Sequence, residues 1–266
     1  MGSCFYAIMY DNINIVKKFM DNEEESESFQ YESRDYGITS VELCLHNENL
    51  DMLKLLLSSE YDFIDAEDSM TNHEFILYHS VQFENLEFVK YCIEELGVDV
   101  NQEIKTCVNK TTALIEASSR KNLEIVEYLV ENGACVDKGY GFRSPLSQAF
   151  YELRKKNVEY LVNNSKNLPE QYINEGFLIT AILAKWFNIA VSLIDKGVDV
   201  NQRNLGDGAK YPLFAALEVE NEMIIEKLLE NGADPTLTET NSETVLEIAR
   251  KFNSDEIVEI ILKYIK

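Results

Sequence analysis

The residues best suited to chemistry in this 266-residue chain are three histidines, His46, His73 and His79. Histidine acts as a general base near neutral pH, and two histidines one helical turn apart can hold a zinc ion. His73 and His79 flank the apolar stretch FILY without the H-E-x-x-H arrangement that places both imidazoles on one helix face. We therefore expect surface or hydrogen-bonded polar histidines and no metal site.

The stretch GYGF at residues 139–142 is a second candidate, because glycine-rich loops can hold phosphate groups. It lacks the third glycine of a dinucleotide-binding loop and the GK[ST] ending of a P-loop. A turn between helices is the better interpretation. The sequence indicates no enzyme, and we expect neither a catalytic residue nor a cofactor.

Composition and charge exclude further classes of protein. The chain is 45% hydrophobic and 27% charged, which is typical of globular proteins. Its net charge of −23 would repel nucleic-acid phosphates and anionic membranes. No apolar run reaches the roughly 18 residues of a membrane span, and no secretory signal opens the chain. We expect a cytoplasmic or otherwise intracellular monomer that binds neither nucleic acid nor membrane.

The elements that position these groups repeat along the chain. The hexapeptide GVDVNQ occurs at residues 97–102 and again at 197–202. In each copy the glycine follows a segment with apolar residues at helical spacing, where glycine can end a helix at positive φ without strain. Similar segments precede Gly133 and Gly232. Each hexapeptide is therefore predicted to follow the end of a helix.

A second, shorter helix is predicted upstream of each of these, with a small residue near its middle that we call the anchor. The eight anchors are Ala7, Cys44, Ser80, Ala117, Ala149, Ala181, Ala216 and Ala249. They are separated by 32 to 37 residues, and seven of the eight residues found nine positions after them are large and apolar. A fixed period of this length indicates a repeat array.

The repeat resembles that of the ankyrin family, whose unit of about 33 residues begins with T-P-L-H-x-A. TALIEA (112–117), SPLSQA (144–149), YPLFAA (211–216) and TVLEIA (244–249) match this beginning, although the family's histidine is replaced in all four. The resemblance implies an all-α ankyrin-repeat solenoid of stacked helix-turn-helix units with β-turn or hairpin connections. We predict one domain, 1–266, with approximate repeats 1–30, 31–67, 68–104, 105–138, 139–169, 170–203, 204–237 and 238–266.

The five cysteines are odd in number and have no CxxC spacing, which suits a reducing compartment. Cys4, Cys44 and Cys92 occupy apolar positions of the repeat and are predicted to be small buried side chains. Cys107 and Cys135 fall in predicted turns.

The family resemblance also implies where a partner binds, since ankyrin arrays generally use the turn tips and the first-helix face of a concave groove. Aromatic residues at such positions mark interface centres, although packing between repeats explains each of them equally well. The first-helix candidates are Tyr10, Phe83, Tyr151 and Phe252, and the turn candidates are Tyr36, Tyr140, Phe142 and Tyr172. We predict contact through Tyr140, Phe142, Tyr151 and Tyr172, with Arg120 and Arg154 at the edge and Phe83 as a further candidate.

Basic residues gather where the two predicted helices of the central repeats meet. These are Arg120–Lys121, Arg154–Lys155–Lys156 and Lys185, where other repeats have Asp11, Glu48, Glu84 and Glu220. They form either a basic ridge for a partner or solvated lysines that offset nearby glutamates. Trp186, next to Lys185, is predicted to be a packing residue.

The function expected from the sequence is a non-catalytic scaffold that binds a partner polypeptide through its concave face and turn tips. The alternative is a regulatory or inhibitory subunit that occludes a basic surface or active site of another protein. An abundance of Lys, Asn and Ile leaves open a microbial or viral host-interaction factor that is delivered into a host cell.

Overall fold

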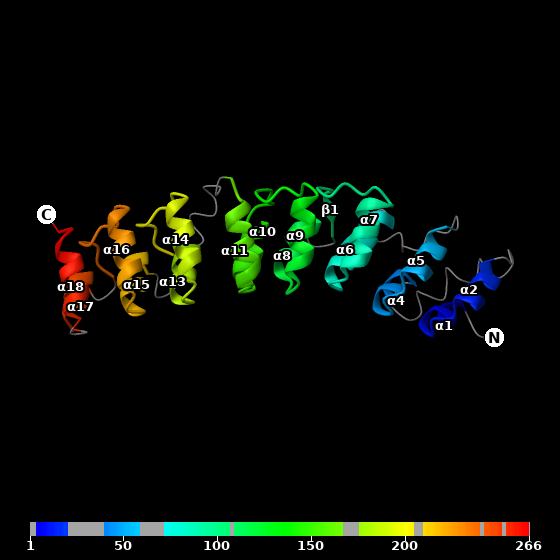
Figure 1. Ribbon diagram of the computed structural model, residues 1–266, viewed down its shortest axis with the longest axis horizontal. Helices are drawn as coiled ribbons and strands as arrows, with labels where there is room; N and C mark the ends of the chain where they lie inside the picture. The colour runs from blue at the N-terminus through cyan, green and yellow to red at the C-terminus, as the bar shows by residue number, and fades with distance from the viewer. Residues whose placement is uncertain are drawn as a thin grey trace. The chain divides into compact units, whose positions relative to one another are not determined.

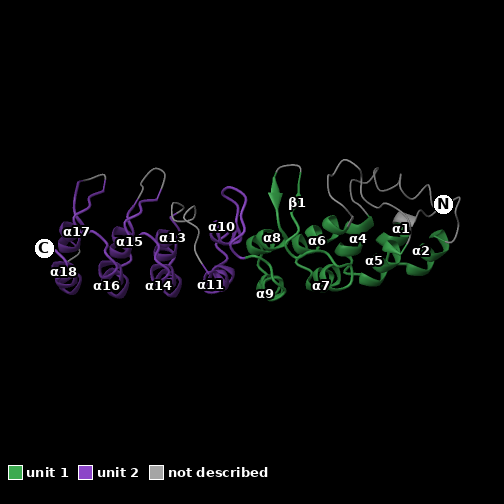
Figure 2. Ribbon diagram, turned by 90° about the horizontal axis from the view of Figure 1, so that it is seen from above, with its two compact units in different colours: residues 1–135 green, residues 136–266 purple. Residues whose placement is uncertain are grey.

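The computed structural model of the protein describes residues 4–20, 40–58, 72–106, 109–166, 176–204, 210–239, 242–251 and 254–265 (Figure 1). The chain divides into two compact units, residues 1–135 (unit 1) and 136–266 (unit 2), shown in separate colours in Figure 2. Tyr36, Tyr172, Phe252 and Cys107 lie outside the described residues. Each unit is built from consecutive pairs of short helices.

Unit 1 contains four described helix pairs and one small hairpin. Its elements are α1 (Cys4–Met9), α2 (Ile13–Met20), α4 (Ser40–His46), α5 (Leu50–Leu57), α6 (Asn72–Gln82), α7 (Leu86–Glu94), β1 (Ile104–Lys105), β2 (Lys110–Thr111), α8 (Ala113–Ser119) and α9 (Leu123–Glu131). The first helices α1, α4, α6 and α8 contact one another in chain order. The strands are antiparallel, with Ile104 opposite Thr111 and Lys105 opposite Lys110.

Unit 2 repeats the same arrangement in its described residues. Its elements are α10 (Pro145–Tyr151), α11 (Lys155–Asn164), α13 (Phe177–Leu183), α14 (Phe187–Asp195), α15 (Pro212–Glu218), α16 (Glu222–Glu230), α17 (Val245–Lys251) and α18 (Asp255–Leu262). The first helices α13, α15 and α17 form one row, and the second helices α11, α14, α16 and α18 form another (Figure 2). The all-α architecture of stacked helix pairs therefore agrees with the sequence expectation. The single domain and its eight repeat boundaries stay a prediction.

Small residues at the centre of each first helix let the helices approach closely. All eight anchors are buried, from Ala7 at 6% exposed to Ala249 at 0%. The residues nine positions later pack beneath them on the second helices, and Val16, Val89 and Ile225 are fully buried. This alternation of small and large side chains, repeated every 32 to 37 residues, builds the core, because a single pair cannot bury its own apolar face.

The turn inside most helix pairs has a left-handed residue that is not glycine. These residues have φ between 51° and 59° and are Asp11, Glu48, Glu84, Leu153, Lys185 and Glu220. The next residue donates its N–H to the carbonyl of the anchor, as Asn49 does to Cys44 at 2.9 Å and Asn221 to Ala216 at 3.2 Å. This hydrogen bond ends the first helix and fixes the direction of the second.

An asparagine begins most of the second helices. The Oδ1 of Asn49 accepts a hydrogen bond from the amide of Met52 at 2.7 Å, and that of Asn221 accepts one from Ile224 at 2.9 Å. Asn12, Asn85 and Asn122 make the equivalent first-turn bonds. At the same place before α11 and α14 stand Arg154 and Trp186, and neither makes a side-chain cap.

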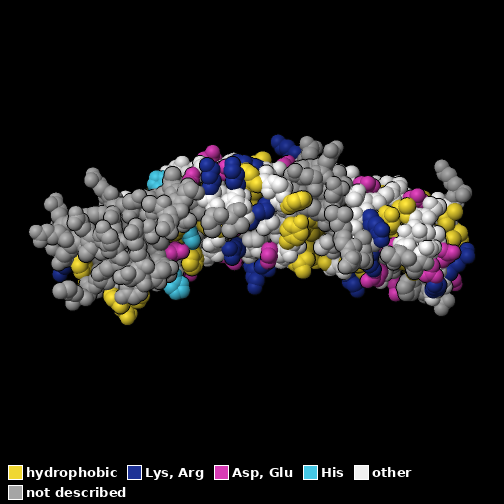
Figure 3. Space-filling model, turned by 180° about the vertical axis from the view of Figure 1, so that it is seen from behind, with side chains coloured by type: hydrophobic (Ala, Val, Ile, Leu, Met, Phe, Trp, Pro, Cys, Tyr) yellow, Lys and Arg dark blue, Asp and Glu magenta, His cyan; other side chains and the backbone are white. Residues whose placement is uncertain are grey.

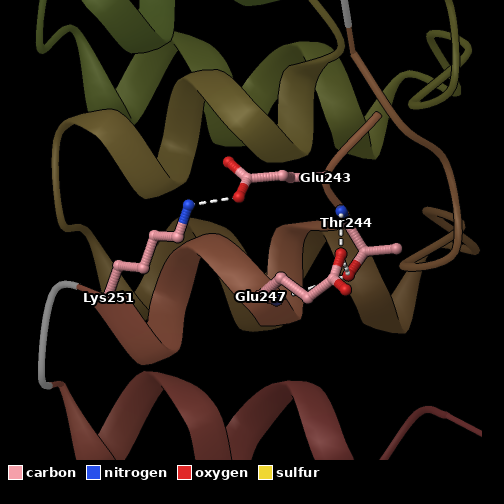
Figure 4. Close-up of polar contacts among 4 residues, drawn as sticks. All are labelled: Glu243, Thr244, Glu247 and Lys251. Atoms are coloured by element: carbon pink, nitrogen blue, oxygen red, sulfur yellow. Dashed lines mark hydrogen bonds and ion pairs between the residues drawn. The ribbon is translucent and has the colours of Figure 1, made fainter. Parts of the chain in front are cut away.

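Two of the first helices, α10 and α17, are capped by the residues that stand where the family has threonine and histidine. At the start of α17 the carboxylate of Glu247 accepts from the amide of Thr244 at 2.8 Å, and Thr244 Oγ1 accepts from the amide of Glu247 at 3.3 Å (Figure 4). Ser144 and Ser147 make the same reciprocal pair at α10. At α10 and α17 the substituted histidine position thus keeps a capping function, whereas Ile115 and Phe214 at the same position of α8 and α15 are apolar and make no cap.

Candidate protein-binding surface

The tip before α10 is a tight two-residue turn that presents one aromatic side chain to solvent. Tyr140 and Arg143 exchange backbone hydrogen bonds at 2.7 and 3.1 Å across Gly141 and Phe142. Gly141 has φ of +61°, so the glycine supplies the left-handed first position that such a hairpin turn requires. Phe142, at the second position, is 80% exposed. The segment GYGF is therefore a turn, as the sequence predicts.

The tip is joined to the first helix beside it. Ser147 donates its hydroxyl to the carbonyl of Phe142 at 2.8 Å, so the turn is held against the first turn of α10. Tyr151 lies four residues after Ser147, on the same face of that helix, and is 59% exposed. Two of the predicted contact residues, Phe142 and Tyr151, are therefore both exposed on elements linked by a hydrogen bond.

Tyr140 differs from its neighbour Phe142 in how much of it a partner can reach. Its side chain is half-buried, and Lys138 Nζ lies 5.8 Å from the ring centroid. Its hydroxyl is buried and has no hydrogen-bond partner among the described residues. Tyr140 supports the tip from inside, and Phe142 is the residue available for contact.

The remaining predicted contact residues are divided between the two units. Phe83 follows α6 and is 43% exposed, and Arg120 follows α8 and is half-buried, both in unit 1. Arg154 in unit 2 lies 3.5 Å from the carboxylate of Glu152. Exposed hydrophobic side chains occur in small groups among charged ones on the face displayed in Figure 3. Tyr10 adds a further exposed aromatic in unit 1, at 75%.

The two GVDVNQ segments connect consecutive helix pairs. Asn101 Nδ2 donates to the carbonyl of Gly133 at 2.9 Å, and Asn101 Oδ1 accepts from the amide of Cys135 at 2.8 Å. Asn201 makes the same pair of bonds, to Gly232 and Asp234, at 2.9 and 2.8 Å. The recurring asparagine is therefore a structural link between turns and not part of a duplicated active site.

Two of the cysteines, Cys44 and Cys92, are buried in the core. Burial raises the pKa of the Cys44 thiol to about 12, and nearby Asp11 raises it further. Burial likewise raises the pKa of Cys92 to about 12, so both cysteines remain protonated. His79 Nδ1 lies 3.6 Å from Glu42, and His46 and His73 are exposed. Among the described residues, no three His, Cys, Asp or Glu side chains gather as a metal site requires.

Within the described ranges, every helix is too short or too polar to cross a lipid bilayer.

Comparison with known proteins identifies the repeat. A family model described as ankyrin repeats in three copies matches residues 42–139 and 77–172. An ankyrin repeat protein of Rickettsia felis is 30% identical over 168 residues, which cover 58% of this chain and 73% of that protein. Alpha-latrocrustotoxin-Lt1a of Latrodectus tredecimguttatus is 25% identical over 171 residues, or 59% of this chain. The chain spans only 12% of that toxin's length.

A solved structure has the same fold. The human ASB11 ankyrin repeat domain superposes with a TM-score of 0.54 at 19% identity, over 85% of this chain and 97% of that domain. At this identity the likeness concerns the fold alone. The described architecture is thus an all-α ankyrin-repeat solenoid, a fold that is generally a non-catalytic scaffold. The chain belongs to the ankyrin repeat family, whose repeats are modules of protein–protein interaction.

Proposed function

We propose that this protein is a non-catalytic scaffold that holds a partner polypeptide against the tip at residues 139–143 and the exposed first-helix face of unit 2. The observation that carries the proposal is Phe142, a phenylalanine that is 80% exposed at the apex of a tip fixed by hydrogen bonds. When a partner covers a large apolar side chain, the burial favours binding by about 25 cal/mol per Å² of apolar area removed from water.

Besides the exposure of Phe142, the fixed conformation of the tip supports a role in binding. Gly141 and the bonds between Tyr140 and Arg143 fix the turn before any partner arrives. A surface that is already ordered loses little conformational entropy on association, so more of the contact energy appears as affinity. Tyr151 enlarges the apolar area, and Arg154 is placed to act at the charged rim.

A photo-crosslinking experiment tests the location of the interface. A benzophenone amino acid replaces Phe142 in one variant and Met223 in a matched control, because Met223 is 54% exposed on the second helix α16. We expect a specific crosslinked polypeptide from the native cell extract at position 142 and not at 223. Equal crosslinking at both positions, or at 223 alone, would contradict the proposal.

Affinity then tests which side chains matter once that polypeptide is purified. Phe142→Ala and Tyr151→Ala are each expected to weaken binding by about 2 kcal/mol, with unchanged circular dichroism. Arg154→Ala should mainly slow association and reduce its salt dependence, as exposed interface charges do. Parent-like affinity in both aromatic variants would place the interface elsewhere.

A second candidate function is the inhibitory subunit that covers a basic surface. The favouring observation is charge, since unit 1 has 27 acidic and nine basic residues, a net of −18. Such a surface would accelerate association with a basic protein at low salt. Stopped-flow association with the crosslinked partner at two ionic strengths tests it, because a rate independent of salt would count against this candidate.

A further inference from the structure

A cleft lies between the second helices α11 and α14 of unit 2, away from the residues of the tip. It has a volume of about 250 Å³. Lys155 and Glu159 of α11 line one wall, and Lys185, Trp186 and residues 187–189 line the other. A second cavity of about 20 Å³ shares Glu159 with it and continues along the same two helices.

The two lysines of the cleft have no carboxylate partner. Within the described part of the chain, neither Lys155 nor Lys185 makes an ion pair, and Lys155 does not pair with Glu159 one helical turn away. The surrounding segment is also unusual for this chain. Residues 138–196 contain eight basic and five acidic residues, a net of +3 within a chain of −23.

The turn that enters α14 differs from most of the other turns. Where four pairs have an acidic residue followed by an asparagine, as in Glu220–Asn221, this turn has Lys185–Trp186, and the turn that enters α11 has Leu153–Arg154. The substitution replaces a negative charge by a positive one and leaves α14 without a side-chain cap. The first amides of α14 therefore still need acceptors beside the cleft.

Apolar surface accompanies the positive charge. Trp186 is half-buried, with its ring centroid 6.2 Å from that of Phe150, and Phe187 beside it is also half-buried. Both residues line the cleft. A ligand that combines a carboxylate with an aliphatic neighbour would use the lysines and the rings together.

The volume limits the size of what can enter. Small-molecule and cofactor pockets usually measure about 300–1,000 Å³, which is larger than the 250 Å³ of the cleft. A single water needs only about 10–15 Å³ of comparable volume. The cleft therefore suits one or two amino-acid side chains projecting from a polypeptide that lies across α11 and α14.

We infer that the α11–α14 cleft is a docking site for an acidic polypeptide segment, which inserts an Asp or Glu side chain between Lys155 and Lys185 and packs a neighbouring aliphatic residue on Trp186. Charge complementarity selects this occupant, because the cleft offers two ammonium groups without a carboxylate partner in a segment of net charge +3, whereas the whole chain has a net charge of −23. The site uses none of the tip residues, so it goes beyond the function proposed above.

Trp186 gives a direct readout, because it is the only tryptophan of the chain. The probe is a blocked peptide of alternating Glu and Leu, and the comparison peptide has Gln in place of every Glu. We expect the acidic peptide to change the Trp186 fluorescence saturably, with weaker binding at higher salt. The neutral peptide should produce no saturable change. Equal binding of both peptides would overturn the inference.

Neutralising the basic and the acidic residues of the cleft should change the affinity for the acidic peptide in opposite directions. Lys155→Gln and Lys185→Gln should each weaken binding of the acidic peptide roughly two- to fivefold, because both lysines are exposed. Glu159→Gln, one turn from Lys155 on the same helix, should strengthen binding of the peptide, because the substitution removes a repulsive carboxylate. Lys263→Gln, at the residue that follows α18, is the control and should bind as the parent does. Unchanged affinity in both lysine variants, or weakening by Glu159→Gln, would overturn the inference.

Two further measurements separate the alternatives. Inorganic phosphate should not reproduce the fluorescence change at the peptide's half-saturating concentration, and if it does, the cleft is a simple anion site and the polypeptide proposal fails. Phe142→Ala should bind the acidic peptide as the parent does. That variant loses the tip function without touching the cleft, so failure of either proposal can be recognised independently of the other.

Discussion

Asn101 and Asn201, one hundred positions apart, make the same two hydrogen bonds, each to the backbone of the turn that ends the following helix pair. Each side chain donates to a glycine carbonyl and accepts from the amide two residues later. The backbone N–H groups of Asn101 and Asn201 donate to Oδ1 of Asp99 and Asp199, at 2.9 and 2.8 Å. Asparagine suits this position because its short amide side chain offers both a donor and an acceptor.

Replacing Asn101 by alanine should destabilise unit 1 by about 0.5–1.5 kcal/mol per hydrogen bond, because the Gly133 carbonyl and the Cys135 amide exchange a protein partner for water. Hydrogen exchange measures the effect at the Cys135 amide. Asn201→Ala is the matched variant in unit 2 and should accelerate exchange at Asp234 instead. Acceleration of both amides in either variant would show that the two links are not local.

The asparagine caps predict a second set of effects. Asn85→Ala removes the acceptor of the Phe88 amide and should cost about 1 kcal/mol of unfolding free energy. Asn85→Ser keeps a side-chain oxygen at the cap and should recover most of that loss. Urea unfolding measures both variants. Equal stability of the alanine and serine variants would mean that the cap contributes nothing.

The anchors predict that added volume is not tolerated. Ala117 is 1% exposed, and Ala117→Leu should destabilise the protein by roughly 1–3 kcal/mol or more through overpacking. Arg120→Ala, three residues later and half-buried, should be nearly neutral for folding. Thermal unfolding of the parent and the two variants measures the effect. Equal melting temperatures for all three proteins would show that Ala117 is not at the close-packed anchor position.

The cap of α17 predicts a dependence on pH. Hydrogen bonds from the amide and hydroxyl of Thr244 lower the pKa of Glu247 below its ordinary value. A lowered folded pKa means that the stabilisation is complete above the ordinary glutamate pKa of about 4.3 and is lost as the pH falls through the folded value.

Glu247→Gln is the matched variant, since glutamine keeps a capping oxygen but does not titrate in this range. The stability difference between parent and variant should favour the parent at neutral pH and shrink at about pH 3. Urea unfolding at both pH values measures it. A difference that stays constant with pH would mean that the carboxylate charge contributes nothing to the cap.

Much of the fold is predictable because it depends on residues at a fixed period. The anchors from Ala7 to Ala249 are all buried, and Gly97, Gly133, Gly197 and Gly232 all have positive φ after their helices. Phe142 is exposed at a turn, as its place between repeats suggests. These features follow from local side-chain size and backbone freedom, which a single sequence displays directly.

Other features require the packed structure. The left-handed φ of Glu48 and Glu84 has no local signal, because acidic residues seldom adopt it without tertiary support. The asparagine caps do have a signal, since asparagine recurs five residues after five of the anchors. Burial of the Tyr140 hydroxyl and the α11–α14 cleft depend on how helices distant in the sequence meet, and no spacing rule specifies that.

The reach of the asparagine link has an evolutionary consequence. The side chain of Asn101 bonds to the turn that follows the next second helix, and that of Asn201 does the same. A duplication or deletion of one whole helix pair would therefore present each link with an equivalent acceptor and donor. The number of repeats can therefore change without loss of folding. An insertion or deletion inside one helix pair would instead disrupt the cap, the anchor contact and the asparagine link together.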